Sequence, residues 1–501
     1  MRPGVGALAR WGLTMLTAAQ AGCVGARPAR PADLIPATLS TSSSQTASEW
    51  SATVRPAAYQ AGEAAAGKGP AAAELLPPPG RACAHSAAAS EPFAGASELS
   101  VEALVQGTLA RNPSLAQMVA AWEAARARYP QVTSLDDPMF TATLAPAGVG
   151  TIEDRNRGYR LDISQKLPWC GKLELRGQNA LAQARAAANS VDDVRLQLIE
   201  SAKAAFYDYY LVVRALEVNA ENLRLLRQFR RNAEARYKTG QAPQQDFLQA
   251  DVEIGRQERR NFTLERVRAV AVARINTLLN EAPDTPLPPP PKRVEVEDGL
   301  PGAAALRAAA LARRPDLQAL ANRLQAEEAA LALAYKDYYP DFQLMAAYDT
   351  FWVEKQLRPQ VAVQMNLPVR LARRDAAVWE AKARLAERRA ELARQVSQVN
   401  YEVNQAAAEV SESKQAARLY ETKVLPAAEL NLKSAQTAYE AGQIPFLSLV
   451  EAERDVIGLK DQYHELVADY YRRLATLERV VGGPLTPAPG ADQSAGVPCN
   501  P

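Results

Sequence analysis

The sequence predicts an α+β membrane protein: a trimeric, twelve-stranded transmembrane β-barrel, with four strands from each chain, that continues into a long α-helical coiled-coil barrel. Three features predict this class. The chain contains an internal duplication, each half holds a pair of short segments with alternating polarity, and each pair precedes a very long segment with helical periodicity. Because apolar runs of about 18 residues or more are missing, any crossing of a membrane would have to use strands.

Composition argues against several other classes. Charged residues make up 23% of the 501 residues and the formal net charge is only +2, so no strong electrostatic field favours nucleic acid. The only histidines are His85 and His464, and the sequence contains no nucleophile motif, phosphate-binding loop or cluster of metal ligands. The four cysteines form no readable disulfide framework. We therefore expect neither enzymatic activity nor a cofactor or metal.

The first residues are typical of a secretion signal, which we predict over residues 1–22. Arg2 and Arg10 supply positive charge around a short, weakly apolar stretch. Two cleavage sites remain open. A small-x-small sequence ending at Ala21 suits ordinary signal peptidase, whereas Ala21-Gly22 before Cys23 suits a lipoprotein signal and would leave Cys23 lipidated. Lipidation is slightly favoured, because cysteine is scarce and lies at the required place.

The body of the chain is a duplication, with a first repeat over residues 96–282 and a second over 302–483. Each repeat should contain, in this order, a helix, two strands, a long helix, a turn and a further helix. Matching landmarks recur at offsets of 200–202 residues: Pro113 and Pro315, Pro138 and Pro340, Pro168 and Pro368, and the turns at 237–243 and 439–445. A proline-rich linker, 283–301, joins the repeats and cannot be helical. A flexible tether rich in Ala, Pro and Ser is expected over 23–95, and a disordered tail over 484–501.

The alternating segments predict four strands. In residues 159–167, apolar and polar side chains alternate, the period of two of a strand with two different faces. The second repeat shows the same alternation over 361–367. Further strands are predicted over 342–348 and, more weakly, over 139–145. Their length of roughly ten residues suits a tilted transmembrane strand, although half-buried strands of a soluble sheet alternate in the same way.

A very long helix follows each pair of strands. From Leu173 to Tyr237 the sequence has no proline and a single glycine. Mostly apolar residues recur at alternating steps of four and three over 198–226 and again over 392–424, a 3.5-residue period typical of coiled coils. Such a helix is about 100 Å long. We expect Pro426 to bend the second long helix near its far end.

Four strands cannot close a membrane barrel by themselves. Open edges in lipid leave backbone groups without hydrogen-bond partners, so closure requires several chains. Three chains supply twelve strands, a reasonable barrel. The long helices would then pack side by side into a tube, because alanine-rich seams permit close approach.

In this order, the features resemble the TolC family of outer-membrane efflux proteins. The resemblance covers about residues 100–483 and includes the two Tyr-x-x-Gly-Gln-x-Pro turns and the stretch Phe206-Tyr207-Asp208-Tyr209-Tyr210. It implies a homotrimer in outer-membrane lipid of a Gram-negative-type bacterium, with a helical tunnel across the periplasm. It also implies a periplasmic adaptor protein and an inner-membrane pump as partners. The stretch 165–173 is similar to the strand-to-helix junction of members that export heavy metals.

The function that this resemblance implies is a passive conduit in a tripartite efflux system, with metal ions or drugs as the first-ranked substrates. Two alternatives stay open: a type I protein secretion channel, and a non-membrane coiled-coil scaffold. The paired, duplicated strands argue against the scaffold. Extraction from membranes would discriminate, since a barrel needs detergent and a scaffold does not.

The two turns should lie at the periplasmic tip of the tunnel. Glycine ends a helix in the left-handed conformation and proline prevents its continuation, so each turn predicts a helical hairpin. The resemblance implies that the tips contact the adaptor. The residues concerned are Tyr237, Gly240, Gln241, Pro243, Tyr439, Gly442, Gln443 and Pro445.

Members of the family tend to carry two acidic residues just past the second turn, where they constrict the pore entrance. The corresponding positions here hold Ser448 and Glu451, and Asp246 is the equivalent of Ser448 in the first repeat. Symmetry-related carboxylates would repel one another and attract cations, although a solvated helix face carries the same residue types. The polar face of the strands should line the barrel lumen, with Arg160, Asp162, Ser164, Lys166, Gln364 and Asn366.

Overall fold

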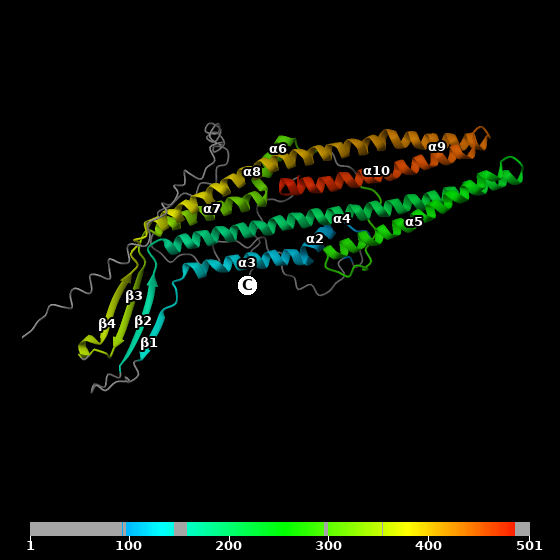
Figure 1. The fold of residues 1–501 in the computed structure, drawn as a ribbon. Helices are drawn as coiled ribbons and strands as arrows, with labels where there is room; N and C mark the ends of the chain where they lie inside the picture. The colour runs from blue at the N-terminus through cyan, green and yellow to red at the C-terminus, as the bar shows by residue number, and fades with distance from the viewer. Residues whose placement is uncertain (1–92, 94–96, 145–157, 295–298, 353, 486–501) are drawn as a thin grey trace, which may run out of the picture. The chain divides into compact units, whose positions relative to one another are not determined.

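The computed structural model describes residues 93, 97–144, 158–294, 299–352 and 354–485 (Figure 1). The predicted signal peptide, Cys23 and almost all of the predicted tether and tail lie outside the described residues. None of the helices that are described combines the length and the hydropathy that a membrane span requires.

The order of elements is repeated, as the sequence duplication predicts. The first repeat holds α2 (Val101–Arg111), α3 (Pro113–Thr133), β1 (Met139–Leu144), β2 (Tyr159–Leu167), α4 (Lys172–Lys238) and α5 (Gln244–Leu278). The second holds α6 (Ala303–Arg313), α7 (Pro315–Lys336), β3 (Phe342–Asp349), a 3-10 turn at Lys355–Leu357, β4 (Pro359–Met365), α8 (Leu371–Leu419), a π-helical turn at Tyr420–Val424, α9 (Leu425–Glu440) and α10 (Phe446–Val481).

One helix was predicted before each pair of strands, but the structure has two. The break falls where Asn112 adopts an extended conformation and its side chain caps the next helix, accepting a hydrogen bond of 2.9 Å from the Ser114 N–H. Pro113 then occupies the first turn of α3, where its missing N–H costs nothing. In the second repeat, Arg314 and Pro315 form the equivalent break.

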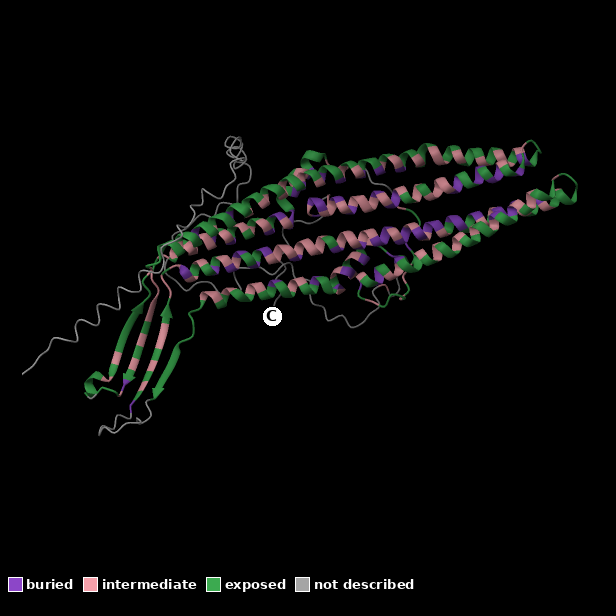
Figure 2. Ribbon diagram, in the orientation of Figure 1, coloured by how far each residue is buried: buried purple, intermediate pink, exposed green. Residues whose placement is uncertain are grey.

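The first very long helix is confirmed. α4 has 67 residues, which corresponds to about 100 Å. The residues predicted to recur at steps of four and three over 198–226 form one stripe along α4. This stripe is largely buried, as at Ala202, Ala205 and Tyr209, and Figure 2 shows buried residues along much of α4. α4 contacts α3, α5, α7 and α10, and therefore joins both repeats.

The second long helix continues through Pro426 by widening one turn. The N–H of Leu425 donates to the carbonyl of Tyr420, five residues back, in the π-helical turn directly before the proline. Proline lacks an N–H for the α-helical ladder, and a π-helical turn at this place lets the chain stay helical. The buried stripe of α8 follows the prediction, with Val399, Val403 and Val410 fully buried.

The four predicted strands form one antiparallel sheet in the order β1-β2-β3-β4. β2 and β3 pair across the two repeats, with Leu161 opposite Tyr348 and Lys166 opposite Gln343. β1 and β4 are the edge strands, and among the described residues neither has a second strand to pair with its outer side. The sheet therefore leaves two edges available for pairing.

Candidate functional site

The sheet exposes its apolar face. Apolar residues on this face include Phe140, Ile163, Leu344, Val361 and Val363, whose exposed fractions lie between 47% and 79%. In water, the exposed face of a two-faced sheet is polar, so this arrangement is the reverse of that in a soluble protein. An outward apolar face is typical of a strand that meets lipid.

The opposite face joins polar side chains across neighbouring strands. The Arg160 Nε donates to Asp162 Oδ1 at 2.8 Å, and the Arg160 guanidinium lies 3.8 Å from Asp349. The Ser164 hydroxyl accepts a hydrogen bond of 3.0 Å from Gln343 Nε2. Five of the six predicted lumen residues therefore lie on this face, since Lys166 and Gln364 both lie opposite Gln343.

Asn366 is the exception among these six residues. β4 ends at Met365, so the prediction that Asn366 belongs to the strand is wrong by one residue. Its side-chain oxygen accepts a hydrogen bond of 2.6 Å from the Asp341 N–H, and its own N–H donates to the Asp341 carbonyl. Asn366 thus ties the end of β4 to the start of β3.

The junction between sheet and helices is fixed by a buried charge. The Lys172 side chain is only 3% exposed, and its ammonium lies 2.9 Å from Asp341 and 3.2 Å from Asp337. The Trp169 ring stacks on Tyr339 at a centroid distance of 5.2 Å. A buried ammonium needs such partners, so the pairing fixes where β2 turns into α4.

The two hairpin tips have the same backbone geometry, which confirms the predicted turns. Gly240 and Gly442 both have φ of 72°. In the first tip, the Gln241 N–H donates to the Arg236 carbonyl and the Gly240 N–H to the Tyr237 carbonyl, a Schellman arrangement. Pro243 and Pro445, in extended conformation, directly precede the returning helices α5 and α10.

Tyr439 joins the two tips and is only 6% exposed. Its hydroxyl donates to Asp246 of the first repeat at 3.2 Å, and the Arg236 guanidinium lies 4.8 Å from its ring centroid. Burial, the charge of Asp246 and this hydrogen bond raise the pKa of Tyr439 to about 12. The predicted adaptor contact does not fit this burial, because Tyr439 packs between the hairpins of its own chain.

The equivalent residue of the first repeat, Tyr237, is 43% exposed and contacts Phe247 at a ring distance of 5.4 Å. The other six predicted tip residues, Gly240, Gln241, Pro243, Gly442, Gln443 and Pro445, are also exposed. The two turns therefore have the same backbone geometry, but the tyrosine of the second turn is buried and that of the first is exposed.

The predicted entrance residues lie near the starts of the returning helices, with Asp246 and Ser448 in the first turns and Glu451 in the second turn of α10. The Asp246 carboxylate is half-buried, and burial raises its pKa, opposed by the Tyr439 hydrogen bond and by Arg236. Ser448 is half-buried and Glu451 is exposed. Within one chain, the structure thus brings Asp246 into contact with Tyr439 of the other repeat.

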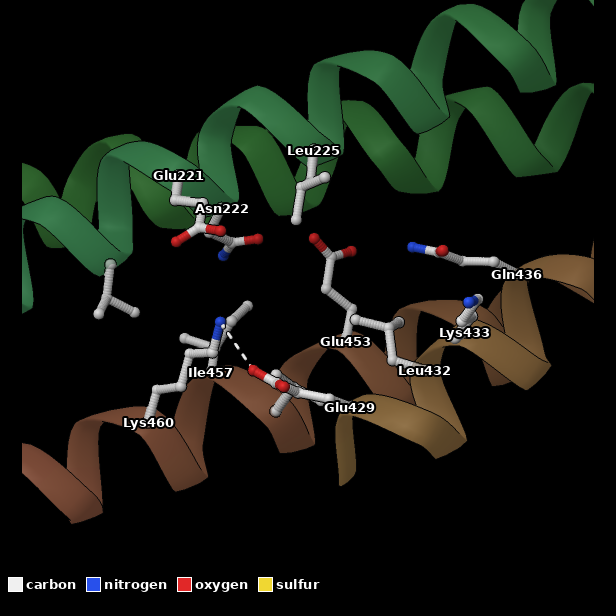
Figure 3. Close-up of a pocket in the computed structure, with 12 residues that line it drawn as sticks. Glu221, Asn222, Leu225, Glu429, Leu432, Lys433, Gln436, Glu453, Ile457 and Lys460 are labelled. Carbon is white, nitrogen blue, oxygen red and sulfur yellow. Dashed lines mark ion pairs between the residues drawn. The ribbon is translucent and has the colours of Figure 1, made fainter. Parts of the chain in front are cut away.

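A cavity of about 350 Å³ between α4, α9 and α10 was not predicted (Figure 3). It is lined by Glu453, which is 1% exposed, and Asn222, which is 2% exposed. Burial and the charge of Glu253 raise the pKa of Glu453 to about 8. The sequence does carry a signal, because Leu449, Glu453, Val456 and Ile457 follow helical spacing and place a carboxylate in an apolar stripe.

Among the described residues, no group of three or more His, Cys, Asp or Glu side chains could hold a metal ion. A family model described as outer membrane efflux protein matches residues 104–281 and 306–483. No curated protein sequence matches the chain.

Three solved structures illustrate the similarity of the fold. The outer-membrane channel OprN has a TM-score of 0.68 and 22% identity, with 80% of this chain and 96% of that chain covered. CusC has a TM-score of 0.67 and 17% identity, covering 76% and 92%. VceC from Vibrio cholerae, an outer membrane protein, has a TM-score of 0.65 and 18% identity, covering 77% and 97%.

Proposed function

The chain belongs to the outer membrane efflux protein family, and from this premise we propose that it is the outer-membrane channel subunit of a tripartite efflux system. Members of this family are passive channels, so the protein is not an enzyme. It lies in the outer membrane of a Gram-negative bacterium, with its helical part in the periplasm. We further propose that three chains assemble into one channel and that this channel works with a periplasmic adaptor protein and an inner-membrane pump.

The observation that carries the proposal is the sheet with an exposed apolar face and two open edges. In lipid, the apolar face contacts hydrocarbon favourably. The backbone N–H and C=O groups of the edge strands, however, have no hydrogen-bond partners there, because the lipid interior contains no water. Pairing β4 of one chain with β1 of the next removes the edges. Three chains would then enclose the polar face, with Arg160, Asp162, Ser164, Lys166 and Gln364, in a twelve-stranded barrel.

The helices extend this conduit. α4 leaves the sheet through the Lys172 junction and ends at the first tip. The seven exposed tip residues, Tyr237, Gly240, Gln241, Pro243, Gly442, Gln443 and Pro445, are the surface we assign to the periplasmic adaptor. Asp246, Ser448 and Glu451 would lie at the pore entrance, where three chains bring like residues together.

The proposed cargo is small solutes, either metal ions or drugs, delivered by an inner-membrane pump. The similarity of residues 165–173 to the junction of heavy-metal exporters supports metals. A strain lacking this gene should become sensitive to the metal or drug that the pump handles, and the wild-type gene should restore resistance. Loss of a secreted protein from the medium, with resistance unchanged, would contradict the proposed cargo.

A substitution at the second tip tests the adaptor surface. Gly442→Leu forces a branched side chain onto a backbone with φ of 72°, at a turn that faces outward. We expect weaker export but normal trimers, measured by resistance and by the heat-sensitive trimer band. Trimers should be normal because the turn at Gly442 is far along the chain from the strands. Unchanged export in this variant would count against the assignment of the tip to the adaptor.

A further inference from the structure

The cavity between the repeats has apolar walls and a polar interior. Val218 and Leu225 of α4, Leu432 of α9, and Val456 and Ile457 of α10 form the aliphatic walls. Figure 3 shows Glu453 extending from α10 toward α4, and Glu221 and Asn222 extending from α4 into the same space. Its volume of about 350 Å³ is that of a site for a small organic molecule.

The polar groups of Glu453 and Asn222 lack partners. Neither carboxyl oxygen of Glu453 and neither polar atom of the Asn222 amide has a hydrogen bond among the described residues. Buried polar atoms nearly always have a hydrogen-bond partner, because an unpaired one has lost its bonds to water without replacement and destabilises the protein. Two groups without protein partners in the described part of the chain, both lining one cavity, could therefore bond the same ligand.

The surroundings favour a cation. Lys460 of α10 is neutralised by Glu429 of α9 at 3.4 Å, and Lys433 of α9 and Glu221 of α4 carry opposite charges at the exposed rim. On α5, the Glu253 carboxylate is already paired with Arg454 and Arg256. An ionised Glu453 would thus be the uncompensated charge of the cavity.

We propose that this cavity is a binding site for a primary alkylammonium ion, whose ammonium bonds to the Glu453 carboxylate and the Asn222 amide oxygen. An ammonium donates three hydrogen bonds, and these are the acceptors that the cavity leaves unpaired. The aliphatic chain of the amine would cover the walls that Val218, Leu225 and Leu432 provide. A small inorganic cation would gain nothing from these walls.

Binding exchanges a proton. The empty site holds Glu453 largely protonated near neutral pH, because burial and Glu253 raise its pKa to about 8. When the ammonium enters with its charge, the carboxyl ionises and its proton passes to the solvent. Binding should therefore strengthen as pH rises toward 8, and it should release protons in proportion to the amine bound.

The duplication supplies a matched control. Asp251 of the first repeat is the equivalent of Glu453, but it is 44% exposed and paired with Arg230 at 2.6 Å. Val424 is the equivalent of Asn222, so the second repeat already carries a valine, which has no amide, at this position. The proposed site is consequently confined to one of the two quasi-equivalent places in each chain.

The test is isothermal titration of n-butylammonium chloride into the full-length, detergent-purified protein, with titration into protein-free micelles subtracted. Repeating it in buffers of different ionisation enthalpy counts the protons released. We expect saturable binding with proton release in the wild type and in Asp251→Asn. Glu453→Gln and Asn222→Val, whose new side chains are close in size to the native ones, should weaken binding about tenfold or more.

Two comparison ligands separate charge from apolar contact. n-Butanol has the same chain without the charge, and ammonium chloride has the charge without the chain, so both should bind about tenfold or more weakly. Equal binding of butylammonium to wild type and Glu453→Gln would overturn the proposal. The proposal would also fail if butanol bound with the same affinity as butylammonium. The same holds if magnesium chloride bound more tightly than butylammonium and this binding required Glu453.

Discussion

At the scale of single residues, Glu453 should make stability depend on pH. Its folded-state pKa, about 8, lies above the ordinary value of 4.5, so the folded protein binds this proton more tightly than the unfolded chain. Its contribution to stability is fully present below the unfolded pKa and is lost as pH rises through the folded pKa. In amine-free buffer, we expect a loss of about 2–4 kcal/mol between pH 5 and pH 9.

Glu453→Gln should remove this loss, because a neutral amide of the same shape has no proton to release. The measurement is the thermal unfolding of the helices at several pH values, monitored by circular dichroism. Asp251→Asn should keep the wild-type pH dependence, since Asp251 is exposed and paired. A pH dependence in Glu453→Gln that equals that of the wild type would show that Glu453 does not titrate as described.

Tyr439 and Asp246 hold the two hairpin tips together through one hydrogen bond. Tyr439→Phe removes the hydroxyl and leaves the ring under Arg236, so the loss is confined to a bond worth about 1.5–3 kcal/mol. We expect the tips to separate more readily and the single-channel conductance in lipid bilayers to increase. Tyr237→Phe, at the exposed equivalent position, should conduct as the wild type, and a conductance increase of equal size there would argue against the specific role of Tyr439.

At the scale of elements, the two faces of the sheet should respond oppositely to charge. Val363 and Gln364 are neighbours in β4 and lie on opposite faces. Val363→Arg would place a charge in lipid and destabilise the barrel by about 2–4 kcal/mol near the midplane. Gln364→Arg would face the lumen and should be tolerated.

The quantity to compare is the fraction of each variant that keeps a folded trimer band in gels as the temperature is raised. In a soluble sheet, Val363 would be a 66% exposed position, and arginine there would be harmless. Equal thermal resistance of the two variants would therefore contradict the assignment of the exposed face to lipid.

Local periodicity predicts these elements well, because each depends on residues close in sequence. The four strands follow from a period of two, and both tips follow from Gly240 and Gly442 with the prolines after them. The breaks at Pro113 and Pro315 were missed, although a proline at the first helical position is visible in the sequence. The π-helical turn before Pro426 was also missed, since proline predicts a disturbed helix but not how the hydrogen bonds rearrange.

The site was less predictable, because it depends on contacts between the repeats. Tyr237 and Tyr439 occupy equivalent positions in the same motif, yet only Tyr439 is buried against Arg236 and Asp246 of the other repeat. The equivalent of Arg236 is Ala438, so the difference lies in residues outside the motif. The cavity at Glu453 likewise forms between α4 and the pair α9 and α10, and its lining residues on α4 lie more than two hundred positions before those on α9 and α10.

At the scale of the whole molecule, duplication explains how one chain can form part of a closed ring. β2 and β3 join the repeats within the chain, and β1 and β4 are left as the two edges. In lipid these edges are satisfied only by other chains, whereas the helices can already pack within one chain. The strands, not the helices, therefore require the oligomer.

Native mass spectrometry of the detergent-extracted protein tests this requirement most directly. We expect an assembly of three chains that releases single chains only when it is heated or stripped of detergent. A protein that remains a stable single chain in water, without detergent, would contradict the account, because its exposed apolar face and open edges would then have no partner.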